Sequence, residues 1–372
     1  MIEEIVATRE RRIGRILINR PRALNALDGR MFAEIGRILE AWRDDDGVEA
    51  VLVRGAGASF SAGGDIRAVR DAALAGDQAA LDRMYSDEYR LNAQIDAYPK
   101  PYVAAVDGYC MGGGLGVAMY GDVVAVTERA QLAMPEVGIG FFPDVGASHV
   151  LPRLPDRIGW YMGLTGARLS AFDALACGLA THLLDDAAFE RIDAITAGGD
   201  LTQNALRHRF DAAATASAPI DPLRPARAPI DPLRPASAPI DSLRPAIARC
   251  FGHDALPDVI AALQREGGRW AEETLAAMRR ASPASVAITF ELFRRGAELT
   301  LHACLEMEYQ LAVRICRSPE FLEGVRAMVI DKDRSPRWNP ARVEDLDPAA
   351  LDALWSEIDV SRNELHLAPV SS

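Results

Sequence analysis

The sequence predicts an α/β fold in which a largely parallel sheet comes first and a mainly helical region follows. Apolar, strand-like runs at residues 13–18, 48–54 and 101–106 alternate with helical spacing such as that of 27–42, a pattern typical of right-handed βαβ crossovers. From about residue 157 onward the apolar periodicity becomes mainly helical. With 372 residues, 49% of them hydrophobic, and a mean hydropathy of -0.01, the chain has enough apolar material for a core of this kind.

The individual elements follow from local signals. Residues 13–18 are the first predicted strand, and Asn19-Arg20-Pro21 is the turn that follows it. Asp28 is a good helix start for the segment that runs to Trp42. Two shorter strands are predicted at 123–126 and 131–134. The later helices are predicted at 158–164, 171–179, 187–197, 257–266, 270–280 and 301–316.

A decapeptide recurs between the later helices. Residues 218–227 (Ala-Pro-Ile-Asp-Pro-Leu-Arg-Pro-Ala-Arg) are followed by near copies at 228–237 and 238–246. Eight of the 22 prolines lie there, so an uninterrupted helix or central strand is impossible and an extended surface segment is expected. A duplicated linker and a partner-docking element both fit this composition. We therefore expect four regions: a core at 1–190, a helical connection at 191–217, the proline-rich repeat at 218–246, and a helical C-terminal region at 247–372 that covers the functional site.

Charge and cysteine usage exclude several classes of protein. The net charge of -12 argues against nucleic-acid binding, although one local basic patch could still bind a phosphate-bearing ligand. The five cysteines are scattered without a CxxC pair, and the six histidines lack ligand spacing, so we expect no disulfide framework and no metal. The chain start lacks a signal-peptide pattern, and the longest uncharged run, 108–121, is too short to cross a bilayer. We expect a cytoplasmic protein without membrane contact.

Two glycine-rich turns each follow a strand and precede a helix. They are Phe60-Ser-Ala-Gly-Gly-Asp-Ile-Arg67 and Gly108-Tyr-Cys-Met-Gly-Gly-Gly-Leu-Gly116. Backbone N–H groups at such turns are free to bind a ligand, and two turns side by side could direct two N–H groups at one oxygen, as in an oxyanion hole. The alternative is that glycine only allows tight packing of strand against helix.

Two carboxylates lie eight residues apart in an apolar loop. Glu136 and Asp144 belong to Pro135-Glu-Val-Gly-Ile-Gly-Phe-Phe-Pro-Asp-Val-Gly146. Apolar surroundings raise the pKa of an unpaired carboxylate, which makes it a better general base. A structural explanation fits equally well, in which Glu136 caps a turn and Asp144 starts a helix.

Together these blocks resemble the crotonase (enoyl-CoA hydratase/isomerase) superfamily, and their details resemble the 3-hydroxyisobutyryl-CoA hydrolase family within it. Phe142-Pro143-Asp144 and the late Ile-Asp-Lys-Asp run at 330–333 match the hydrolase branch. Further matches are Asn19-Arg20-Pro21, Asn25-Ala26-Leu27, Ser282-Pro-Ala-Ser285 and Glu308-Tyr309. The resemblance implies a crotonase (ClpP/crotonase-like) fold of repeated ββα units with a helical C-terminal region. After Gly146 the hydrolases usually continue with glycine and an aromatic residue, whereas this chain has Ala147-Ser148-His149.

The resemblance also implies roles for particular residues. The oxyanion hole would be formed by the backbone N–H groups of Gly64 and Gly113. The first of the two hydratase glutamates would fall at Gly116 and is absent, whereas the second is Glu136. We interpret Glu136 as nucleophile or general base. Asp144 would orient water or the acyl hydroxyl group, or carry a proton.

Substrate contacts are implied in the same way. Glu88 would accept a hydrogen bond from the 3-hydroxyl group of the acyl chain; the alternative is a solvated glutamate on a helix face. The adenine-ribose end of CoA would lie against Ala62, Asp65 and Ile66, and Arg67 would meet a phosphate or be plain surface. No separate cofactor is expected, because CoA is part of the substrate.

These expectations favour hydrolysis of the thioester of a short branched 3-hydroxyacyl-CoA, above all 3-hydroxyisobutyryl-CoA in valine catabolism. A thiol leaves as thiolate with little help because its pKa is about 8.5, so one well-placed carboxylate and an oxyanion hole are enough. One rival is an enoyl-CoA hydratase or isomerase, and Gly116 argues against hydration. The other is a non-catalytic acyl-CoA-binding protein that docks a partner through the repeat. Superfamily members form trimers and hexamers, so a homo-oligomer is expected unless the C-terminal region blocks it.

Overall fold

A computed structural model describes residues 3–217 and 238–367, which form two compact units. Unit 1 is drawn from Met1–Gly64, Leu91–Ala133 and Arg168–Ser242. Unit 2 is drawn from Asp65–Arg90, Met134–Ala167 and Leu243–Ser372. The units interleave along the chain, whereas the division expected from the sequence is consecutive; that division stays a prediction.

Most of the decapeptide repeat, residues 218–237, lies outside the described residues. Its third copy contains a short 3-10 turn, Pro239–Ser242, and the start of helix α11, Arg244–Phe251. Pro245 lies in the first turn of α11, where its missing N–H group costs no helical hydrogen bond. Within 238–246 the chain is thus a turn followed by the start of a helix, and Ala238 and Ile240 are buried, so the expectation of an extended surface segment is wrong for the third copy.

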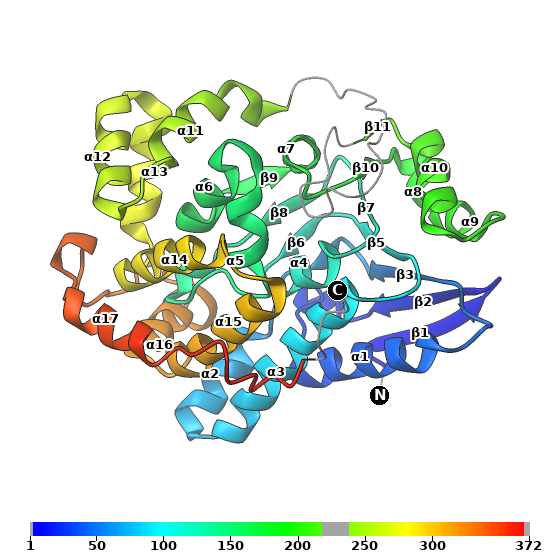
Figure 1. The fold of residues 1–372 in the computed structure, drawn as a ribbon, viewed down its shortest axis with the longest axis horizontal. Coiled ribbons are helices and arrows are strands. Elements are labelled where there is room, and N and C mark those ends of the chain that lie inside the picture. Colours follow the sequence, from blue (N-terminus) through cyan, green and yellow to red (C-terminus); the bar gives the residue numbers. More distant parts are fainter. Residues whose placement is uncertain (1–2, 218–237, 368–372) are drawn as a thin grey trace. The chain divides into compact units, whose positions relative to one another are not determined.

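A seven-stranded sheet forms the core of unit 1 (Figure 1). Its strand order is β1-β2-β3-β5-β7-β10-β11, and pairing is parallel from β2 through β10. This confirms the predicted parallel sheet and its strands at β2, β3, β5 and β7. The bounds are β1 (Ile5–Glu10), β2 (Ile13–Ile18), β3 (Ala50–Gly55), β5 (Tyr102–Val106), β7 (Val123–Val126), β10 (His182–Leu183) and β11 (Ala216–Ser217).

A second, four-stranded sheet explains the ββα repeat. Its order is β4-β6-β8-β9, with bounds β4 (Ser59–Ser61), β6 (Tyr109–Met111), β8 (Gln131–Ala133) and β9 (Arg168–Ser170). Along the chain, β3 leads into β4, β5 into β6, and β7 into β8. The β4, β6 and β8 strands pair in parallel, so each repeat adds one strand to each sheet. The ββα units implied by the resemblance are therefore present.

Strand β1 was not predicted because the turn after it lacks the residues that usually indicate a β-hairpin. It pairs antiparallel with β2 through a two-residue turn at Arg11 and Arg12. Both arginines have left-handed backbone angles, with φ of 50° and 69°. Such turns normally use Asn-Gly or Asp-Gly, so two arginines do not indicate a hairpin.

Helices cover the sheet of unit 1. Asp28 accepts a hydrogen bond from the Met31 amide at 3.0 Å and caps α1 (Gly29–Arg43), as expected. The predicted helix at 187–197 is instead two helices that meet at Arg191, where φ and ψ depart from helical values. The other helices of this unit are α4 (Gly113–Ala118), α7 (Ala171–Cys177), α8 (Asp186–Glu190), α9 (Ile192–Ala197) and α10 (Gln203–Ala213).

Unit 2 is helical. The predicted helices at 158–164, 257–266, 270–280 and 301–316 are confirmed as α6, α12, α13 and α15. The bounds are α2 (Ile66–Ala75), α3 (Gln78–Asp96, in this unit up to Arg90), α5 (Ala147–Val150), α6 (Ile158–Thr165), α12 (Leu256–Glu266), α13 (Gly268–Arg280), α14 (Pro283–Gly296), α15 (Leu301–Ile315), α16 (Pro319–Val325) and α17 (Pro348–Ser356).

Candidate active site

In unit 1 the two glycine turns lie side by side. Because β4 and β6 pair in parallel, the turns that follow them emerge together. Gly63 has φ of 101°, and a Cβ atom there would stand 2.9 Å from the Met111 carbonyl oxygen and 3.5 Å from the Gly113 nitrogen. Glycine at position 63 is therefore needed both for its backbone angle and for this close approach.

Two N–H groups at these turns remain available. Gly113 begins α4 and is buried, and Gly64 lies at the end of the first turn. Among the described residues, the backbone N–H groups of Gly64 and Gly113 donate to no protein acceptor. Free, preorganised amide donors are what stabilisation of an oxyanion requires.

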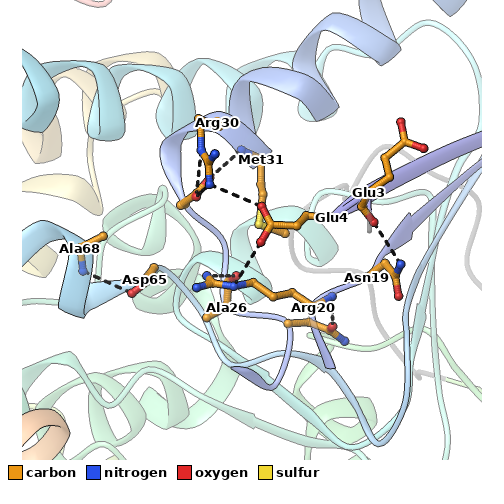
Figure 2. A network of polar contacts seen from close by, with 11 residues as sticks. Glu3, Glu4, Asn19, Arg20, Ala26, Arg30, Met31, Asp65 and Ala68 are labelled. Atoms are coloured by element: carbon orange, nitrogen blue, oxygen red, sulfur yellow. Dashed lines mark hydrogen bonds and ion pairs between the residues drawn. The ribbon is translucent and has the colours of Figure 1, made fainter. Parts of the chain in front are cut away.

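The turn after β2 supports the first glycine turn. Leu27 N donates to Gly63 O at 2.9 Å, and Ala62 N donates to Leu24 O at 2.9 Å. Figure 2 shows Arg20, which donates to the Ala26 carbonyl at 3.2 Å and lies 3.5 Å from the Glu4 carboxylate. These contacts explain why Asn19-Arg20-Pro21 and Asn25-Ala26-Leu27 accompany the glycines in the sequence.

The candidate catalytic carboxylates lie in unit 2. Glu136 is the first residue of a short 3-10 helix, Glu136–Ile139, and is 8% exposed. Ser282 N donates to Val137 O at 2.9 Å and fixes this helix to the start of α14. Glu136 Oε2 is buried and has no hydrogen-bond partner among the described residues. Burial, and next the charge of Asp144, raise the pKa of Glu136 well above 4.5.

Asp144 is buried close to Glu136 and has a defined partner. The Tyr89 hydroxyl group, on α3, donates to Asp144 Oδ2 at 2.7 Å. Burial raises the pKa of Asp144 to about 7, although the hydrogen bond from Tyr89 opposes this shift. A carboxylate with a pKa near neutrality is suited to accept and return a proton.

Glu88 belongs to the same cluster. It is 3% exposed, so the alternative of a solvated glutamate on a helix face is wrong. Burial raises its pKa well above 4.5, and the charges of Asp144, Glu136 and Glu308 raise it further. We name Glu88, Glu136, Asp144 and Glu308 the carboxylate cluster, and all four belong to unit 2.

Aromatic rings lie beside this cluster. The ring of Tyr85 stacks on Phe141 at 5.8 Å between centroids, and Phe141 stacks on Phe142 at 4.5 Å. Phe321 contacts Phe141 edge-on at 5.7 Å. The charges of Asp144 and Glu88 act on the Tyr85 hydroxyl group, which places the rings and the carboxylates together.

Sequence reasoning assigned no role to Tyr89 or Glu308. Tyr89 follows Glu88 directly, and only its proximity to that residue could have drawn attention to it. Glu308 was noted as part of a matching motif, without a function. It contacts the loop after Asp144 across more than 150 residues of chain, which no local pattern reveals.

The residues expected to contact CoA fall on short segments of both units. Ala62 belongs to unit 1, and Asp65, Ile66 and Arg67 belong to unit 2. Asp65 caps α2 by accepting from Ala68 N at 3.3 Å (Figure 2). Arg67 is exposed and donates to Val329 O at 3.3 Å. CoA contact by these four residues stays a prediction.

The described part of the chain has neither a metal-binding cluster nor a membrane-spanning helix. Within residues 3–217 and 238–367, no three or more His, Cys, Asp or Glu side chains are placed so that they could hold a metal ion. No helix within these ranges is both long and apolar enough to span a membrane.

Known proteins with a similar sequence and structure show the superfamily of the chain. A family model for enoyl-CoA hydratase/isomerase matches residues 13–355. A crystal structure named enoyl-CoA hydratase, from Rhodobacter sphaeroides, has a TM-score of 0.82 and 36% identity, covering 95% of this chain and 97% of its own. One named carnitinyl-CoA dehydratase, from Mycobacterium thermoresistibile, has a TM-score of 0.81 and 35% identity, covering 100% and 98%. These matches confirm the crotonase fold.

Curated relatives identify the family within this superfamily. The protein named 3-hydroxyisobutyryl-CoA hydrolase, mitochondrial, is 36% identical in Xenopus tropicalis, over 95% of this chain and 89% of the relative. The protein of that name in Gallus gallus is 34% identical, over 95% and 88%. Probable 3-hydroxyisobutyryl-CoA hydrolase 3 of Arabidopsis thaliana is 32% identical, over 99% and 98%. The chain therefore belongs to the 3-hydroxyisobutyryl-CoA hydrolase family of the enoyl-CoA hydratase/isomerase superfamily.

Proposed function

We propose that the chain hydrolyses the thioester of a short branched 3-hydroxyacyl-CoA, above all 3-hydroxyisobutyryl-CoA, to the free acid and CoA in valine catabolism. The observation that carries the proposal is the state of Glu136. It is a buried carboxylate close to Asp144, and its Oε2 atom has no hydrogen-bond partner among the described residues. The position of the other hydratase glutamate is the buried Gly116, which has no group to add water across a double bond. The names of the curated relatives support this choice.

The chemistry assigned to each residue follows from its environment. The thioester oxygen accepts from the N–H groups of Gly64 and Gly113, which stabilise the negative charge that develops on it. Glu136 acts in one of two ways. It attacks the carbonyl carbon and expels CoA thiolate, leaving an anhydride that water then cleaves, or it takes a proton from the water that attacks. Asp144 orients that water and moves its proton.

Substrate recognition uses groups around the reacting carbonyl. Glu88 accepts from the 3-hydroxyl group, which offsets the cost of burying its carboxylate. Ala62, Asp65 and Ile66 contact the adenine-ribose end of CoA, and Arg67 meets a phosphate. No cofactor other than the CoA of the substrate enters this proposal.

We also propose a reducing compartment as the cellular setting of the chain. All five cysteines are buried and none forms a disulfide, which fits a reducing compartment. The cytoplasm remains our proposed location, although several relatives carry the word mitochondrial in their names. The expected homo-oligomer also stays a prediction, and sedimentation velocity measures it.

Parallel assays on one preparation distinguish hydrolysis from hydration. We expect rapid release of free thiol from 3-hydroxyisobutyryl-CoA and no loss of the enoyl absorbance of crotonyl-CoA. Consumption of crotonyl-CoA without thiol release would assign the chain to the hydratases. Binding of both compounds without turnover would instead support the non-catalytic alternative.

Replacing Tyr89 with Phe should move the pH dependence of thiol release. The Tyr89 hydrogen bond stabilises the ionised form of Asp144, so its loss raises the pKa of that group above about 7. Because Asp144 must be ionised to accept a proton, the activity of Tyr89→Phe should begin to fall at a higher pH than that of the unmodified chain. We expect the acid limb of kcat to shift upward by roughly one unit, about tenfold in rate at pH 6.5, with recovery near pH 9. An unmoved acid limb would contradict this role for Tyr89.

A further inference from the structure

Glu308 is a fully buried glutamate on α15 whose two oxygens both bind the loop that follows Asp144. Oε2 accepts from Gly146 N at 2.6 Å. Oε1 accepts from Ser148 N at 3.0 Å and from Ser148 Oγ at 2.6 Å. One carboxylate therefore fixes the backbone at two points, two and four residues beyond Asp144.

Just before these two points, Val145 has a backbone conformation that is unfavourable for its residue type. Val145 is buried and has φ of 55°, a left-handed angle that a β-branched residue rarely adopts. Gly146 follows with φ of 83°, and Asp144 O accepts from Ala147 N at 2.9 Å. Strained backbone of this kind persists only where surrounding contacts enforce it, and it is common at functional sites.

Helix α14 supports the loop from another direction. A Cβ atom on Gly296, the last residue of α14, would stand 2.2 Å from Ser148 O, so only glycine allows this approach. Arg153 donates to the carbonyls of His149 and Gly296 at 2.5 and 3.0 Å. Ser148 itself belongs to the Ala147-Ser148-His149 departure from the usual hydrolase pattern, and it provides two of the three donors to Glu308.

Titratable groups surround Asp144 on several elements of unit 2. Glu88 and Tyr89 face it from α3, Glu136 from the 3-10 helix and Glu308 from α15. Burial raises the pKa of Glu308 to about 8, and its three hydrogen bonds oppose the shift. Cys304 is the titratable group on α15 that interacts with Glu308.

We propose that Glu308 is a positioning residue for the hydrolytic reaction, which sets the direction of the Asp144 carboxylate through the backbone of residues 146–148. The inference rests on the proposed function. It assigns Glu308 no contact with substrate, and it explains why a carboxylate is buried so far along the chain from the catalytic loop.

A matched pair of variants separates positioning from simple stability. Glu308→Gln replaces one acceptor oxygen with an NH₂ group, which leaves Gly146 N or Ser148 N facing another donor. Glu306→Gln is the control. Glu306 is also buried on α15, and it accepts from Gln310 Nε2 at 2.8 Å and from Leu365 N at 3.0 Å, away from the Asp144 loop.

Three readouts are measured on both variants and the unmodified chain: kcat and KM for thiol release, the acid limb of kcat, and amide hydrogen exchange over residues 144–150. For Glu308→Gln we expect kcat to fall about 10²-fold with KM within about threefold. The acid limb should stay in place, because below its own pKa of about 8 Glu308 is protonated and glutamine removes no negative charge from beside Asp144. Exchange over 144–150 should accelerate. Glu306→Gln should change neither the limb nor this exchange.

The outcomes that would overturn the proposal are distinct from failure of the proposed function. An unmodified chain that releases no thiol refutes the hydrolase function itself. An active chain in which Glu308→Gln matches Glu306→Gln in kcat and exchange refutes the positioning role alone. If Glu308→Gln fails to fold, Ser148→Ala provides the same comparison, because it removes the 2.6 Å side-chain bond. An unaltered kcat and exchange rate would then overturn the proposal.

Discussion

Glu136→Gln is expected to reduce kcat for thiol release from 3-hydroxyisobutyryl-CoA by about 10³-fold or more, with little change in KM. The substitution keeps the size of the side chain but removes the carboxylate that attacks the thioester or activates water. Stopped-flow or steady-state thiol detection measures the loss. A variant that retains more than a tenth of the original kcat would show that Glu136 is not the reacting group.

The same variant should be more stable than the unmodified chain at neutral and alkaline pH. The folded-state pKa of Glu136 lies well above 4.5, so as the pH rises past that value the unfolded chain ionises first and the free energy of unfolding falls. Glutamine has no proton to lose, and each unit of raised pKa corresponds to about 1.4 kcal/mol. The gain in Tm should therefore be larger at pH 8 than at pH 5.

Asp144→Asn should give the second-largest loss of activity and should also abolish the acid limb. The pKa of Asp144 is about 7, and its ionised form accepts the proton, so the unmodified chain loses kcat about tenfold for each unit below pH 7. Asparagine cannot titrate. We expect kcat to fall about 10²- to 10³-fold and the limb with its midpoint near pH 7 to disappear.

Asp144→Asn should not disturb the local fold, because the hydrogen bond from Tyr89 can persist. The asparagine Oδ1 atom can still accept from the Tyr89 hydroxyl group, so Asp144→Asn retains that contact. A midpoint near pH 7 that persists in the variant would assign the limb to another member of the carboxylate cluster and would contradict the role given to Asp144.

The site residues that could be predicted from the sequence are those that lie in short continuous segments. Gly64 and Gly113 lie in turns between a strand and a helix, and Glu136 and Asp144 lie in one apolar loop, so their local chemistry is visible in a few consecutive residues. The parallel sheet was predicted in the same way, from apolar runs separated by helical spacing.

Features that depend on long-range contacts could not be predicted. Glu308 binds Gly146 across 162 residues of sequence separation, and Tyr89 binds Asp144 across 55. Nor does local pattern reveal that Glu88 is buried, because a glutamate next to Asp87 on a helix normally faces solvent. The β1–β2 hairpin was missed for the opposite reason, since its local signal, Arg11-Arg12, is contrary to usual turn preference.

The most direct test of the account compares 3-hydroxyisobutyryl-CoA with isobutyryl-CoA, which differ only in the 3-hydroxyl group. Free-thiol release from each should be measured as kcat/KM on the unmodified chain. If Glu88 binds the hydroxyl group and Glu136 cleaves the thioester, the hydroxylated substrate should be preferred by about 10²-fold or more, because the deoxy compound leaves a buried carboxylate without its partner. Equal rates with both compounds, or no thiol release from either, would contradict it.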